Sequence, residues 1–288
     1  MGLKLGVMPV LGGRGAADPG VTAAFVRQLE QLGCESVWAV EHLVVPEAYR
    51  SGYPYDASGR MGLGPDDDIP DPLEWLTFAA AHTTRLVLGT AMLILPLHHP
   101  VGLAKRLATL DVLSGGRLIA GVGVGWLREE YDAVGVPFTR RGRLADEYLD
   151  VLRALWTGAP ASHHGPAVRF DGVHSAPRPT RPGGVPIMIG GHSDAAVRRA
   201  ARFGTDFYPL GVDVPALARM LDRLRVECAA LGRDPAEVAV TVRAPGTRAE
   251  ADALRELGVS RVVIRADPRD PERVAATVDR YRREILGE

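Results

Sequence analysis

The 288-residue chain has only two cysteines, Cys34 and Cys228, too few to build a disulfide framework for a protein of this size. It has no apolar run close to the roughly 20 residues that cross a bilayer, and its first residues lack the apolar stretch of a signal peptide. Neither sign of charge is in excess, because the chain has 34 basic and 35 acidic residues. We therefore expect a cytoplasmic protein whose partner is neither a membrane nor a nucleic acid.

Several signatures of catalysis are also absent. The eight histidines show no H-E-x-x-H or zinc-ligand spacing, so we expect no metal site. The G-x-S-x-G motif is missing, which argues against a serine hydrolase. The acidic residues 66–68 lie in a stretch rich in glycine and proline, and we interpret them as part of a solvated loop.

Eight short apolar runs alternate with amphipathic stretches along the whole chain. Near-continuous Val, Ile and Leu is typical of parallel strands that are covered on both faces. Eight strand–helix units predict a (β/α)8 TIM barrel of the α/β class, in one domain over residues 1–288. An open doubly wound sheet is the alternative, although it usually has fewer strands and an earlier glycine fingerprint. The expected strands lie within residues 3–9, 36–42, 86–96, 117–125, 186–191, 205–211, 238–245 and 261–266.

Two connections are longer than ordinary loops. Residues 43–71 follow the second predicted strand and carry three tyrosines and two arginines, and residues 159–185 precede the fifth strand. Loops at the mouth of a barrel build its active site, so we interpret the two insertions as a lid and a pocket wall. The alternative is that each is a surface insertion without a functional role.

The fourth predicted strand is bare on one face. Gly121, Gly123 and Gly125 occupy alternate positions, and side chains alternate between the two faces of a strand. A dinucleotide fingerprint is excluded, because Trp126 stands where G-x-G-x-x-G needs its third glycine. Either the bare face makes room for large neighbours, or a flat ligand lies against it. The glycines run to the C-terminal end of the strand, where barrels bind ligands, and this favours the ligand.

Four long motifs follow one another: SVWAVEH, LGTAMLILPLHHP, AKRLATLDVLSGGRLIAGVGVGWLREEYDAVGVPF and VPIMIGGHSDAAVRRAARFGTDFYP. In content, order and spacing they resemble the bacterial luciferase-like superfamily of flavin and deazaflavin enzymes. Within it, the chain is similar to the branch that uses the deazaflavin coenzyme F420. The resemblance covers most of the chain. It implies a TIM barrel that holds the ring of F420, or of FMN, at the C-terminal end of its strands.

The resemblance also implies specific contacts with the coenzyme ring. Gly121, Gly123 and Gly125 would become wall space for the ring or its ribityl chain. A non-prolyl cis peptide bond between Ala91 and Met92 would back the ring from a bulge in the third strand. The residues alone predict an ordinary strand there.

Glu41 and His42 end the second predicted strand. Histidine can exchange a proton near neutral pH, which hydride transfer to a carbonyl or imine requires, although a packed histidine is the alternative. In related deazaflavin enzymes an acid and a histidine lie here beside the ring. The resemblance therefore implies acid–base work for His42 and a coenzyme contact for Glu41. Some relatives add an acid at the position of Trp126, but tryptophan cannot transfer a proton.

A glycine-rich turn follows the fifth predicted strand. Gly190 and Gly191 precede His192 and Ser193, which open a helix, and free backbone N–H groups at a helix start attract anions. In the family this turn receives the coenzyme phosphate, although Ser193 also fits a plain helix cap. His98 and His99 lie just ahead of another predicted helix, and they either edge the pocket or serve the start of that helix.

Taken together, these patterns predict an oxidoreductase that uses F420 for hydride transfer with a small organic substrate. We expect a homodimer. An FMN-dependent monooxygenase on the same fold is the first alternative, and a coenzyme-binding protein without turnover is the second.

Overall fold

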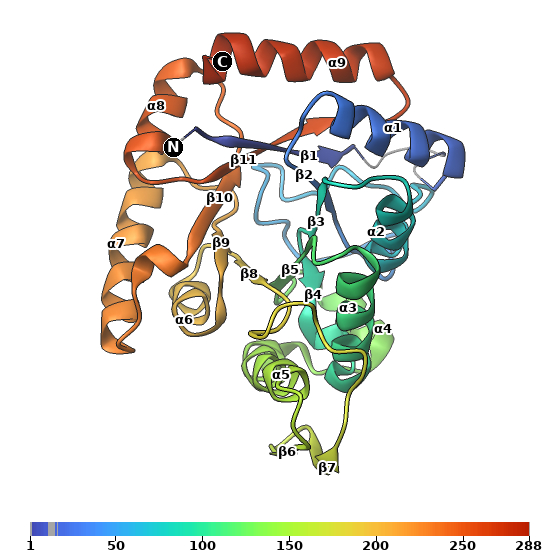
Figure 1. Cartoon of the computed structure of the whole chain (residues 1–288), viewed down its shortest axis with the longest axis vertical. Helices are drawn as coiled ribbons and strands as arrows, with labels where there is room; N and C mark the ends of the chain where they lie inside the picture. The colour runs from blue at the N-terminus through green and yellow to red at the C-terminus, as the bar shows by residue number, and fades with distance from the viewer. Residues whose placement is uncertain (1, 11–14, 16, 288) are drawn as a thin grey trace.

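The eight predicted strands all form, and they pair in parallel around a closed barrel (Figure 1). The computed structural model describes residues 2–10, 15 and 17–287. The barrel closes because the first strand pairs with both the second and the last. This confirms the predicted (β/α)8 barrel. Its strands are β1 (Lys4–Pro9), β2 (Ser36–Ala39), β3 (Val87–Thr90) with its short continuation β4 (Leu93–Ile94), β5 (Leu118–Gly123), β8 (Ile187–Gly190), β9 (Asp206–Tyr208), β10 (Ala239–Arg243) and β11 (Arg261–Ala266).

Helices surround the strands on the outside of the barrel (Figure 1). Several of them start with an aspartate cap followed at once by proline, as at Asp18 and Asp71, because proline fits the first helical position. None of the helices in the described residues is long and apolar enough to cross a membrane. The helices are α1 (Pro19–Gln31), α2 (Pro72–Ala81), α3 (Pro100–Leu113), α4 (Arg128–Val134), α5 (Arg141–Trp156), α6 (Asp194–Phe203), α7 (Val214–Ala230), α8 (Arg248–Glu256) and α9 (Pro271–Arg280), which continues as a π-helix over Tyr281–Leu286.

Each strand packs its two faces against different partners. The outward face carries aliphatic side chains that meet the helices, while the inward face forms a small separate cluster around Trp38 and Met188. The indole of Trp38 fits inside because Gly6 and Gly89 have no side chains. A Cβ on Gly89 would lie 2.1 Å from the Trp38 ring. Glycine in a strand therefore makes room here for a large neighbour.

A buried ionic cluster closes the N-terminal end of the barrel. Arg261 donates to Asp206 at 2.7 Å and to Thr241 at 2.9 Å, and it forms two further bonds with Glu35 at 2.7 and 2.8 Å. Burial raises the pKa of Asp206 to about 6, against the opposing charge of Arg261. Polar groups that leave water are stable only when they are paired, and here one guanidinium serves two carboxylates.

The two insertions lie in different places. Residues 43–71 leave β2 at the C-terminal end of the barrel and contain no helix or strand. Residues 159–185 follow α5 and contain the hairpin of β6 (Ala161–His164) and β7 (Arg169–Val173), which Figure 1 shows beyond α5 and away from the barrel strands.

The prediction that residues 159–185 form a pocket wall is wrong. The hairpin packs on α5, and Thr180 donates through its backbone and its hydroxyl to Asp111 of α3, both at 2.7 Å. The physical reason is connectivity, because a segment that joins a helix to the next strand starts and ends at the N-terminal end of a parallel barrel. It is a surface insertion over α3 and α5.

The ionic cluster makes a testable prediction about stability. Arg261→Met leaves the Asp206 carboxylate buried without its cation, and we expect a loss of about 3–5 kcal/mol in the free energy of unfolding. Because the pKa of Asp206 is already raised, a proton can remove the buried charge. The deficit should shrink as the pH falls from about 7 to about 5.

Urea unfolding of the variant and the parent at each pH measures this deficit. The control is Arg219→Met on the exposed face of α7, which should change stability by less than about 0.5 kcal/mol. Equal losses for the two variants, or a deficit that grows at lower pH, would contradict the role given to the cluster.

Candidate active site

A histidine–carboxylate pair joins the ends of β2 and β5. His42 follows β2, and Glu130 lies in the first turn of α4, which comes after β5. His42 Nδ1 lies 3.1 Å from Glu130 Oε2, and Glu130 Oε1 accepts the backbone N–H of Leu43 at 2.9 Å. The Glu130 side chain is 1% exposed and that of His42 is 11% exposed. A buried carboxylate with both oxygens in use holds the imidazole in one orientation and directs Nδ1–H toward itself.

A second pair lies beside the first. Glu41 Oε1 is 2.8 Å from His98 Nε2, and Glu41 Oε2 accepts the backbone N–H of Ile94 at 2.6 Å. Both oxygens of Glu41 are therefore bound by the protein, so its clearest role is to position β4. Its predicted contact with a coenzyme stays a prediction. His98 contacts Glu41 and so lies at the site. His99 is the residue that precedes α3, and its side chain makes no capping hydrogen bond.

The chain bulges between β3 and β4. The peptide bond between Ala91 and Met92 is cis, as the family resemblance implies. Both β3 and β4 pair with β5, so the two residues between them step out of the ladder next to the glycine-rich strand. The Met92 side chain covers the neighbouring glycines, since a Cβ on Gly190 would lie 2.6 Å from its Cγ.

The three glycines of the bare face have different neighbours. A Cβ on Gly121 would lie 1.9 Å from the backbone oxygen of Thr90, and one on Gly125, which has a φ of +62°, would lie 2.7 Å from Ile94. Packing alone accounts for both positions. A Cβ on Gly123 would meet only the Met92 side chain, at 3.3 Å. Gly123 is the position best suited to a coenzyme wall, and the coenzyme contacts of all three stay predictions.

The turn after β8 has the geometry of an anion site. Gly191 has a φ of +116°, and Ser193 accepts the N–H of Ala196 at 3.2 Å, so the serine does cap α6. Within the described residues, the N–H groups of Asp194 and Ala195 have no acceptor. Free N–H groups at a helix start bind anions, and the cap does not compete with that role.

Aromatic side chains from the loop after β2 cross the mouth of the barrel. The ring of Trp126 lies edge-on to His42 at 6.2 Å and to Tyr53 at 5.1 Å. Tyr53 contacts Tyr55 at 5.4 Å, and Tyr55 contacts His192 at 5.7 Å. This row runs from the His42 side to the turn after β8. The loop therefore lies where a lid would lie, and its closure on a ligand stays a prediction.

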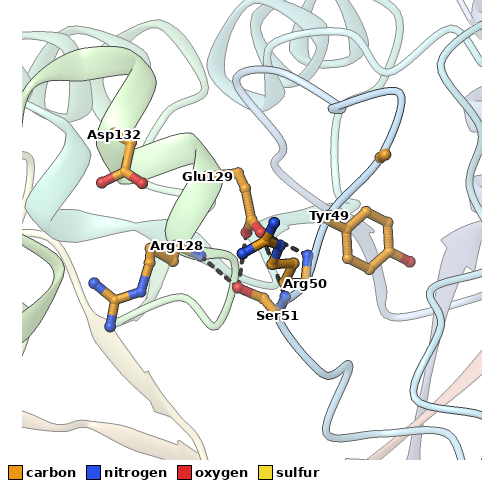
Figure 2. A pocket seen from close by; sticks show the side chains of 7 residues that line it. Tyr49, Arg50, Ser51, Arg128, Glu129 and Asp132 are labelled. Atoms are coloured by element: carbon orange, nitrogen blue, oxygen red, sulfur yellow. Dashed lines mark hydrogen bonds between the residues drawn. The ribbon is translucent and has the colours of Figure 1, made fainter.

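The same loop is fastened to α4 at its outer edge. Glu129 accepts the backbone N–H of Arg50 and the hydroxyl of Ser51, both at 2.7 Å, and Ser51 in turn accepts the N–H of Arg128 at 3.1 Å (Figure 2). An open hollow of about 600 Å³ lies beside this contact. None of the site residues predicted from sequence lines it, so we place the chemistry at the barrel mouth instead.

Glu130 is the functional candidate that the sequence did not reveal. It lies four residues after Trp126 and places a buried carboxylate against His42 Nδ1. Acidic residues are common in the first turn of a helix, because their negative charge interacts favourably with the positive end of the helix dipole. The pattern Glu129–Glu130 therefore gave no sign that one carboxylate turns inward to His42 while the other binds the loop.

The glycine contacts generate a paired prediction. Gly121→Ala forces a methyl against a backbone oxygen and should lower the free energy of unfolding by about 3 kcal/mol, at the upper end of overpacking costs. Gly123→Ala meets only a flexible side chain and should cost less than about 1 kcal/mol. Thermal unfolding of both variants measures the difference, and a larger loss at Gly123 would show that the neighbours are wrongly assigned.

Comparison with known proteins agrees with this geometry. The family model described as luciferase-like monooxygenase matches residues 5–284. An uncharacterised protein of Mycobacterium tuberculosis is 34% identical over 273 residues, which cover 92% of this chain and 94% of that protein.

Two solved structures share the fold. An F420-dependent secondary alcohol dehydrogenase, in complex with an F420–acetone adduct, has a TM-score of 0.75 at 15% identity and covers 100% of both chains. The oxygenating constituent of 3,6-diketocamphane monooxygenase from Pseudomonas putida, in complex with FMN, has a TM-score of 0.75 at 16% identity over 100% of this chain and 99% of that one. The match over nearly the whole length shows that this chain belongs to the luciferase-like monooxygenase family.

Proposed function

We propose that the chain is an oxidoreductase that uses coenzyme F420 for hydride transfer with a small organic substrate. The observation that carries the proposal is His42, held at the barrel mouth by the buried carboxylate of Glu130. Hydride transfer to a carbonyl must be matched by a proton on oxygen, and the reverse reaction must remove it. Histidine is the side chain best suited to this exchange near neutral pH.

The residues at the mouth fit the coenzyme. Gly123 and the Ala91–Met92 bulge would hold its ring, and the N–H groups at the start of α6 would hold its phosphate. When bound, the deazaflavin supplies or accepts the hydride at ring carbon C5. Asp194 lies in the first turn of α6, and its negative charge opposes an anion at this helix start.

His42 is expected to move the proton through Nε2, because Glu130 occupies Nδ1. Within the described residues, Nε2 has no hydrogen-bond partner, so it is available to a substrate oxygen. Glu130 keeps the imidazole in one orientation through its contact with Nδ1. The row of Trp126, Tyr53 and Tyr55 would exclude water from the reacting atoms once a ligand fills the mouth.

An FMN-dependent monooxygenase is the second candidate. It is favoured by the family description and by the equal TM-score of the FMN-bound structure. Reduced FMN activates oxygen, whereas a deazaflavin has carbon in place of N5 and reacts poorly with oxygen. Oxygen consumption therefore separates the two candidates.

Coenzyme choice is tested by titrating the protein with F420 and with FMN while following tryptophan fluorescence. Trp126 lies at the mouth, so F420 should quench the parent at micromolar concentration and should quench Trp126→Phe less. Trp75→Phe, a buried tryptophan of α2, is the matched control and should keep the quenching. Tight binding of FMN alone, with oxygen uptake, would replace the proposal by its alternative.

The roles of the dyad are tested by His42→Ala and Glu130→Gln. His42→Ala should lower turnover about 10²–10⁴-fold, the usual contribution of a general acid–base group, while F420 affinity changes little. Glu130→Gln should lower turnover while F420 affinity changes little, because the carboxylate that fixes the orientation of the imidazole at Nδ1 is lost.

Stopped-flow bleaching of F420, with a substrate found by screening alcohols and ketones, measures both effects. Asp132→Asn removes an exposed carboxylate from the same helix and is the control. Unchanged turnover in His42→Ala would remove this histidine from the mechanism. Binding of F420 with no bleaching across the panel would support a coenzyme-binding protein without turnover.

A further inference from the structure

Two arginines lie on the inner face of the barrel where β10 and β11 end. Arg243 follows Thr241 by two residues, and Thr241 bonds Arg261 and Asp206 inside the barrel. Arg265 follows Arg261 by four residues and is on the same face. Because alternate residues of a strand share a face, Arg243 and Arg265 project from the inner wall at the C-terminal mouth.

The register makes the two arginines diagonal neighbours. Arg243 pairs with Val263, which belongs to the inner cluster, and Arg265 is two residues beyond Val263 and pairs with Met8 of β1. Like charges on neighbouring strands repel one another when nothing lies between them. The repulsion between these two arginines therefore lowers the stability of the folded protein unless a bound anion offsets it.

Neither arginine has a partner within the described residues. Both are exposed, and neither makes a hydrogen bond, an ion pair or a ring contact there. The buried carboxylates at the mouth are unavailable to them, because Glu41 is held by His98 and Glu130 is held by His42. Among the residues that the structure describes, the two guanidinium groups at the mouth therefore have no counterion.

The charges of both arginines reach the side chain of Tyr208. Burial raises the pKa of Tyr208, which ends β9, and the charges of Arg243 and Arg265 both oppose that rise. Arg265 acts in the same way on Tyr53, whose pKa is also raised by burial. Tyr208 belongs to the inner cluster with Val263, and it ends the strand that pairs with β10, so both arginines lie on its side of the mouth. Tyr53 belongs to the loop after β2, and this loop would cover a group that the two arginines bind.

The couple lies apart from the predicted coenzyme contacts. The bulge, Gly123 and the turn after β8 belong to β3, β5 and β8, which are consecutive around the barrel. Continuing around the barrel from β8, the next strands are β9, β10 and β11. After β11 come β1 and β2, and His42 lies just after β2. A molecule held by the arginines would therefore extend toward His42 from the side opposite the coenzyme ring.

We propose that Arg243 and Arg265 bind an anionic group of the substrate, so that the enzyme acts on small organic acids that carry a carboxylate, sulfonate or phosphate. Paired guanidinium groups match the geometry of an oxyanion, and their hydrogen bonds to it are charge-assisted. The proposal deepens the proposed function and rests on it for the reaction. The oxyanion site itself does not depend on which coenzyme the protein uses.

The site is tested with inorganic sulfate as the probe, in the absence of coenzyme. Sulfate titrated against chloride at constant ionic strength should raise the Tm of the parent. The double variant Arg243→Gln/Arg265→Gln should need at least about tenfold more sulfate for the same rise, since two charge-assisted contacts are lost. The control is Arg198→Gln/Arg219→Gln, with the same charge change on exposed positions of α6 and α7, and it should respond like the parent.

Two further measurements distinguish the source of the anion from failure of the proposed function. F420 affinity of the double variant should match the parent, and a loss of F420 affinity would assign the oxyanion to the coenzyme and overturn the proposal. Turnover of an acidic substrate should fall relative to its neutral ester in the double variant only. A sulfate response that is equal in the double variant and the parent would also overturn it, whereas a specific response with no F420 turnover would contradict only the proposed reaction.

Discussion

The site depends on one buried carboxylate, that of Glu130. It accepts the backbone N–H of Leu43 and faces Nδ1 of His42, so it ties the end of β2 to the helix that follows β5. A charged carboxylate that is 1% exposed is stable only when both of its oxygens are satisfied. Glu130 therefore fixes three features together, which are the position of the imidazole, the first residues of the loop over the mouth and the start of α4.

Around this contact the mouth divides into two halves. The half formed by β3, β5 and β8 is lined with glycine, the cis-bonded bulge and the open start of α6, which suits a planar, phosphate-bearing coenzyme. The half formed by β9, β10 and β11 carries Tyr208 and two arginines that have no ion-pair partner in the described part of the chain. His42 lies between the halves, where a proton would be exchanged with a substrate held against the ring.

The sequence predicted the barrel because its signal is local and repeated, with eight apolar runs separated by capped helices. It also predicted the place of His42, since a residue just after a barrel strand must lie near the mouth. It did not reveal Glu130, because an acid in the first helical turn looks like an ordinary cap. It wrongly predicted a pocket wall for residues 159–185, because the length of an insertion does not tell at which end of the barrel it lies.

The glycines of β5 show a further limit of sequence reasoning. Alternation alone showed a bare face, but only the fold shows what fills it, which is the Thr90 backbone at Gly121 and the Met92 side chain at Gly123. The most direct test of the account is a crystal structure with F420 and a substrate analogue bound. The account predicts His42 Nε2 within about 2.6–3.2 Å of the analogue's carbonyl oxygen, on the face of the ring opposite the Ala91–Met92 bulge. A ring that turns its other face to His42, or an analogue that Nε2 cannot reach, would contradict it.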